Sequence, residues 1–91
     1  GTQVPIHRHL DTIESAFLLR GRIDEIFFDE NGKETERFHL DTKSGYYGIQ
    51  IPIGVWHTVY VIEPSVLLEI KAGKYHTLAF TDTLQTISNK K

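Results

Sequence analysis

Residues 15–28, which read SAFLLRGRIDEIFF, decide the fold class of this 91-residue chain. The stretch is rich in Phe, Leu and Ile, is interrupted by Gly21, and is followed by Asp29-Glu30-Asn31-Gly32. Asn-Gly between apolar runs is the strongest short signal for a hairpin turn. The stretch therefore predicts a long β-strand that ends in a hairpin. Residues 34–40, where polar and apolar side chains alternate, are the expected return strand.

Further stretches outside this hairpin combine apolar and aromatic residues with flanking turn residues, as strands do. They cover residues 45–53, 56–62 and 65–70. Pro52 and Gly54 end the first of them, and Glu63-Pro64-Ser65 separates the other two. Residues 77–91 predict one more strand or a polar tail of the same domain. Because no ten-residue segment has a helical period, we expect an all-β sandwich or barrel.

Length and composition indicate one ordinary globular domain. Hydrophobic residues make up 40% and charged residues 24% of the chain, the formal net charge is −2, and the basic residues are scattered. This balance argues against nucleic acid or a membrane surface as the partner. No apolar run is long enough to span a bilayer, and no signal-peptide pattern opens the chain. Cysteine is absent, which excludes disulfides and thiolate ligands and fits the cytoplasmic location that we expect.

Three histidines and one glutamate offer a full set of ligands for a divalent metal. His7 and His9 are two residues apart and would project from one face of an extended strand. Glu14 follows a short turn and can return to meet them from the next strand, and His57 opens a later strand. Imidazole and carboxylate without sulfur suit Fe, Mn, Co, Ni or Zn. Because four protein ligands leave octahedral positions open, catalysis or ligand binding is expected rather than a structural role.

The spacing of these residues resembles the two sequence motifs of the cupin superfamily. His7-x-His9-x4-Glu14-x6-Gly21 resembles the first motif, G(x)5HxH(x)3-4E(x)6G. Pro52-x-Gly54-x2-His57 resembles the core of the second motif, G(x)5PxGx2Hx3N. The leading glycine of the second motif is displaced to Gly45 or Gly48, and Val61 stands where the family often has Asn. Neither departure removes a ligand.

More narrowly, the chain resembles the WbuC-type cupin-fold metalloproteins in residues 27–32, 51–58 and 68–75, so that the likeness extends over residues 7–75. The resemblance implies a single cupin domain, a double-stranded β-helix or jelly-roll barrel with residues 1–76 as its core. It also implies one bound divalent metal and a bacterial setting connected with surface polysaccharides.

The function expected from this resemblance and the ligand set is metal-dependent binding or conversion of a small oxygenated metabolite, such as a sugar derivative. Two alternatives stay open. One is a non-catalytic module that binds or senses a small ligand through its metal. The other is a metal-stabilised dimer subunit without a pocket, which would fill its interior with Phe, Leu and Ile side chains.

Glu69 is the candidate acid beside the metal. It interrupts the apolar run of residues 66–70, where a carboxylate needs a partner or a role. It would hydrogen-bond a ligand histidine or act as a general acid and base. The alternative is a surface position paired with Lys71 or Arg20.

The candidate substrate-binding residues are Gln50, Tyr47 and Arg20. Gln50 and Tyr47 lie on the stretch that leads toward His57, and Arg20 shares the strand parity of Glu14. For the first two, packing in the core or at its rim is the alternative. Two further histidines, His39 and His76, lie outside the motifs and are expected at the surface.

A homodimer is the expected assembly. Few residues precede His7, whereas a strand or two usually come before this motif in cupins. An incomplete barrel exposes a sheet edge, which proteins cover by pairing with a partner.

Overall fold

The computed structural model describes residues 2–72, 74–80 and 86–90, and every regular element within them is a β-strand. The strands are β1 (Thr2–Gln3), β2 (Glu14–Phe28), β3 (Glu34–Asp41), β4 (Gly48–Ile51), β5 (Trp56–Lys71), β6 (Lys74–Phe80) and β7 (Thr86–Lys90). The all-β prediction is confirmed. None of these residues belongs to a helix of the length and apolarity that a bilayer crossing requires.

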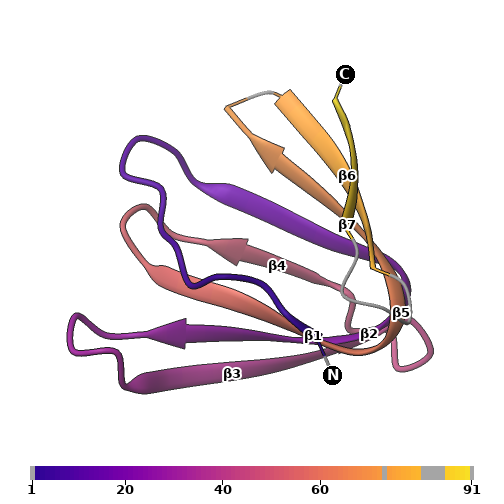
Figure 1. Cartoon of the computed structure of the whole chain (residues 1–91), viewed down its shortest axis with the longest axis horizontal. Helices are drawn as coiled ribbons and strands as arrows, with labels where there is room; N and C mark the ends of the chain where they lie inside the picture. The colour runs from indigo at the N-terminus through magenta and orange to yellow at the C-terminus, as the bar shows by residue number, and fades with distance from the viewer. Residues whose placement is uncertain (1, 73, 81–85, 91) are drawn as a thin grey trace.

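The two long strands β2 and β5 pair antiparallel and form the spine of the molecule (Figure 1). Glu14 lies opposite Lys71 at one end of the pair, and Phe28 lies opposite Trp56 at the other. Midway along the pair the register shifts several times, and both strands bend there. The sheet therefore folds over, and its two halves face each other. They separate toward the end remote from the bend, called here the open end.

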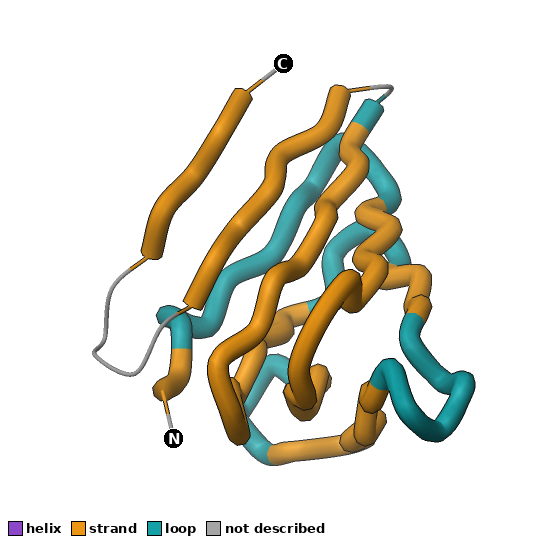
Figure 2. Tube along the Cα trace, turned by 90° about the vertical axis from the view of Figure 1, so that its right-hand side faces the viewer, coloured by secondary structure: helices purple, strands orange, loops and turns teal. Residues whose placement is uncertain are grey.

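The shorter strands extend the two halves. The strand order is β3-β2-β5-β6-β7, with β1 paired to β5 and β4 paired to β2. One half contains β1, β3, the second part of β2 and the first part of β5. The other half contains β4, β6, β7 and the remaining parts of β2 and β5, with β7 at its edge beside β6 (Figure 2). Each long strand thus contributes to both halves.

The prediction of separate strands over residues 56–62 and 65–70 is wrong, because β5 runs through Pro64 without a break. Proline ends a strand when its missing N–H would leave a gap in the ladder. Here the pairing with β2 passes from Glu63 to Val66, so Pro64 lies in the bend, where no such bond is lost.

The predicted hairpin after residue 28 is present, although its loop is longer than the two-residue Asn-Gly turn. The last pair is Phe28 with Glu34, and the Asp29 carboxylate accepts the backbone N–H groups of Asn31 and Lys33, both at 2.9 Å. Gly32 has a φ of 82°, which glycine adopts without strain. The Asp29 side chain therefore organises a five-residue loop. Similarly, β4 is shorter than the predicted stretch 45–53, because residues 42–45 form a turn.

The interior changes in polarity from the bend to the open end. Near the bend the two halves bury one apolar cluster, which consists of Ala16, Leu18, Ile23, Leu40, Val59, Val61, Leu67 and Phe80. Toward the open end the same inward faces carry Glu14, Glu25 and His57, each only 1% exposed. Burial of the apolar cluster stabilises the fold, whereas the buried polar side chains lie toward the open end.

Gly21→Ala is expected to destabilise the protein strongly. Gly21 has a φ of 94°, and a Cβ there would overlap the Ser65 hydroxyl and the Pro64 carbonyl oxygen. The left-handed conformation alone costs a side chain about 1–2 kcal/mol, and the overlap adds to it. The control is Gly32→Ala, which has a similar φ of 82° and nothing within 4 Å of the added atom. Equal losses of unfolding free energy in urea would contradict this account of the bend.

Candidate metal centre

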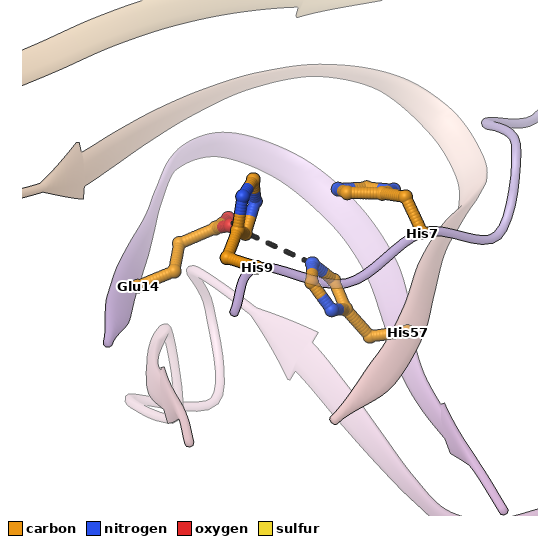
Figure 3. A group of neighbouring side chains, drawn as sticks. All are labelled: His7, His9, Glu14 and His57. Carbon is orange, nitrogen blue, oxygen red and sulfur yellow. Dashed lines mark ion pairs between the residues drawn. The ribbon is translucent and has the colours of Figure 1, made fainter. Parts of the chain in front are cut away.

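The four predicted ligands His7, His9, Glu14 and His57, called here the metal cluster, come together at the open end (Figure 3). Each offers one ligand atom, and these atoms all lie within 4.8 Å of one another. Glu14 is the first residue of β2, and His57 is the second residue of β5. The two histidines of the N-terminal segment lie outside the regular strands, in contrast to the predicted strand.

Backbone hydrogen bonds hold the N-terminal segment against β5 and the turn before it. The N–H of His7 donates to the carbonyl of His57 at 3.0 Å, and the N–H of His57 donates back at 2.8 Å. The carbonyl of His9 accepts the N–H of Gly54 at 2.7 Å. The Pro52-x-Gly54 corner therefore fixes His9 as well as leading into His57.

Two of the imidazoles have a defined tautomer. The Nδ1 of His7 lies 2.9 Å from the Pro5 carbonyl oxygen, and the Nδ1 of His57 lies 3.0 Å from that of Val55. A carbonyl oxygen can only accept, so both Nδ1 atoms carry the proton. In their neutral forms the two rings therefore have a free lone pair on Nε2, and the backbone contact sets the ring orientation as it does in metal sites.

The buried atoms of the cluster lack hydrogen-bond partners. The Oε1 of Glu14 lies 2.9 Å from the Nε2 of His9 and 3.5 Å from the Nε2 of His57. Although these atoms are close and shielded from solvent, none of them makes a hydrogen bond of normal geometry. Buried polar atoms are nearly always satisfied, so a group of unsatisfied ones calls for a missing partner. A divalent metal fits this donor set.

The charges in the cluster favour the metal-binding forms. Burial opposes ionisation of Glu14, but contacts with His57 and Glu69 and the charges of His57 and Lys71 lower its pKa to about 2. Burial and the charge of Lys71 lower the pKa of His9. Metal ligands must be deprotonated. At neutral pH, Glu14 is a carboxylate and His9 is a neutral imidazole.

The structure brings Glu69 to the metal cluster. It lies opposite Ala16 in the β2–β5 pair and contacts Glu14. Burial and the neighbouring Glu14 together raise the pKa of Glu69 to about 8, against the smaller opposite effect of Lys71. A neutral Glu69 therefore lies beside an ionised Glu14 at neutral pH.

The three predicted substrate-binding residues lie elsewhere. Gln50 is exposed and pairs with Ser15, one position out of phase with Glu14, so it faces away from the interior. Tyr47 is 51% exposed and lines a surface hollow with Phe17 and other residues. Arg20 is exposed and lines a hollow beside the bend. None of them is part of the metal cluster.

Glu25 is a buried acid that sequence reasoning missed. It is 1% exposed, and neither carboxyl oxygen has a hydrogen-bond partner. Burial, followed by the charges of Glu14 and Glu69, raises its pKa to about 9. A signal was present in the sequence. Asp24 and Glu25 are adjacent in a strand, so one of the two carboxylates had to face the interior.

His76 departs from the expected surface position. It is partly buried and lies opposite Glu69 in the β5–β6 pair, and its Nδ1 is shielded from solvent without a partner. His39, by contrast, has a side chain that is 72% exposed, 2.7 Å from the carboxylate of Asp24. His76 thus adds an imidazole to the polar end of the interior.

Glu25→Gln is expected to raise the unfolding free energy of the metal-free protein at pH 8 by at least about 1 kcal/mol, the scale of one pKa unit. The folded-state pKa of about 9 lies above the ordinary 4.5. The unfolded chain therefore releases this proton from about pH 4.5 upward while the folded protein retains it, and the wild type loses stability as the pH rises to about 9. Gln does not titrate, so the gain should shrink as the pH falls toward 4.5.

Urea unfolding between pH 4.5 and 8.5 measures this difference. The exposed Glu63→Gln variant is the matched control and should unfold like the wild type. A constant or reversed difference for Glu25→Gln would show that this carboxyl has an ordinary environment in the folded protein.

Comparisons with known proteins add one match. The model of a family described as a domain of unknown function, DUF6016, matches residues 1–40. No curated protein and no solved structure matches the chain. The matched residues include His7, His9, Glu14 and Glu25, whereas His57 and Glu69 lie beyond them.

Proposed function

We propose that this protein is a cupin-type metalloprotein that binds one divalent transition metal and uses it to bind or convert a small oxygenated molecule, such as a sugar derivative. The proposed ligands are His7, His9, Glu14 and His57. The observation that carries the proposal is the convergence of their ligand atoms within 4.8 Å, with buried donor atoms that have no hydrogen-bond partner.

The cupin jelly roll is part of this proposal, and two features of the sheet support it. The antiparallel sheet folds over so that β2 and β5 each contribute to both halves (Figure 1). The ligands of the first motif lie at or before the start of β2, and the ligand of the second motif lies at the start of β5. Glu14 of the first motif and His57 of the second thus reach the open end from different halves of the sheet.

The residues of the cluster and Glu69 would have different roles in binding or converting the small molecule. A divalent metal bound there would supply a Lewis acid for a carbonyl or hydroxyl oxygen. Glu14 supplies negative charge, and the backbone contacts of His7 and His57 hold their Nε2 atoms toward the cluster. Glu69 holds a proton beside Glu14 and is the proposed acid and base of the site, because a group that titrates near neutral pH serves in both directions.

His9→Ala is expected to weaken metal binding by at least about tenfold. Removing a metal ligand should lower the affinity at least as much as removing a residue that hydrogen-bonds such a ligand. Its side chain is 24% exposed, so the fold should tolerate the change better than a change at the buried His57. The measurement is calorimetric titration of chelator-stripped protein with Mn, Co, Ni or Zn. His39→Ala, a histidine outside the cluster, is the control. Wild type that binds none of these metals, nor iron under anaerobic conditions, would refute the proposed function.

Glu69→Gln is expected to keep the metal stoichiometry of the wild type. Glu69 contacts a ligand but is not one of the four residues whose donor atoms converge. The affinity should change less than it does in His9→Ala, because the amide preserves the shape of the side chain. Elemental analysis of both variants, purified in parallel, makes the comparison. A loss of metal as complete as that of His9→Ala would place Glu69 among the ligands instead.

A further inference from the structure

Glu25 is the buried group that the proposed metal site leaves unexplained. It is 1% exposed, and both of its carboxyl oxygens are shielded without a hydrogen-bond partner in the described part of the chain. A buried carboxyl normally finds a partner, because an unsatisfied one lowers the stability of the fold. A polar group retained at such a cost points to a ligand that satisfies it.

The strand register places Glu25 behind the metal cluster. Phe27, two residues along β2 and on the same face, lies opposite His57, and Glu25 itself lies opposite Val59 of the apolar core. The charges of Glu14 and Glu69 act on Glu25 from the other half of the sheet. The carboxyl groups of Glu14, Glu25 and Glu69 therefore face one interior. Of these three residues, only Glu14 belongs to the metal cluster.

We propose that Glu25 is a ligand-binding residue, which hydrogen-bonds a neutral molecule bearing hydroxyl or amide groups that reaches into the interior behind the metal cluster. This inference rests on the proposed function and deepens it by naming the class of ligand. Glu25 acts through a hydrogen bond to that molecule and is not a ligand of the metal.

The surroundings of Glu25 select a neutral ligand. Its cross-strand neighbours Val59 and Phe38 are apolar, so burying a carboxylate or phosphate there would carry a large desolvation cost. A second metal is disfavoured, because the oxygens of Glu25 are not among the converging donor atoms. A neutral carboxyl both donates and accepts, which complements a hydroxyl or an amide.

The test uses cobalt-loaded protein and two probes that differ in charge, glycolamide and glycolate, followed by visible absorption and calorimetry. Wild type should bind glycolamide, and replacing Glu25 should weaken glycolamide binding more than the binding of glycolate, whose carboxylate the cobalt itself attracts. Glu25→Leu should bind cobalt with wild-type stoichiometry but lose about tenfold in glycolamide affinity, the scale of one buried hydrogen bond. Glu25→Gln, which also donates and accepts, should stay within about threefold of the wild type. Glu63→Leu, at an exposed position beside the bend, is the matched control.

A second readout needs no ligand. Metal-free Glu25→Leu should melt at least about 4 °C above the wild type, because Leu removes an unsatisfied buried carboxyl from a domain of this size. If Glu25 had a structural role, Glu25→Leu would instead melt at a lower temperature than the wild type, because the loss of Glu25 would leave a gap in the packing.

The outcomes separate this inference from the proposed function. Wild type that binds no cobalt would count against both. Cobalt-loaded wild type that does not bind glycolamide overturns the inference alone, as does a Glu25→Leu variant that loses glycolate and glycolamide affinity equally. The same holds if Glu25→Leu binds glycolamide as the wild type does, melts at a lower temperature without metal, or loses cobalt.

Discussion

The joint bend of β2 and β5 is the constraint on which the other features depend. Gly21 adopts a conformation with a φ of 94° and leaves no room for a side chain against Pro64 and Ser65. The Ser65 hydroxyl accepts the N–H of Arg22 at 3.0 Å and lies 2.7 Å from the Glu63 carbonyl, to which it donates. This hydroxyl replaces ladder bonds that the register shift removes. Without the bend, the sheet would have no interior.

The interior that the bend creates has an apolar part, which stabilises the fold, and a polar part, which contains the candidate site. Its apolar part lies at the bend, and its polar part lies where the halves separate. The metal cluster draws on a loop, the start of β2 and the start of β5. Glu69 and Glu25 face the same space from opposite halves, which places two neutral acids near the ionised Glu14. The carboxyl groups differ in protonation because they differ in their contacts, not in their chemistry.

The sequence was most informative where the relevant spacing is local. The strand β2, its hairpin and the grouping of His7, His9 and Glu14 follow from short-range patterns, whereas adding His57 to them relied on the likeness to the second cupin motif. The burial of Glu25 and His76 depends on which residues of other strands lie opposite them, and this register is not a local property. The outward position of Gln50 could not be predicted for the same reason, because its phase is set by pairing with Ser15. Pro64 led to the wrong prediction of two separate strands, because a bend can accommodate a proline that a straight strand cannot.

The long-range pairing of β2 with β5 also bears on how the protein folds. His7 and His57 are separated by more than half of the chain, yet their backbones bond directly. Contacts between such distant segments form late and slowly, since the intervening loop must close first. The cluster is therefore complete only once the two ends of the spine have met. A metal that needs all four side chains would bind the finished fold, and its uptake would mark the last stage of folding.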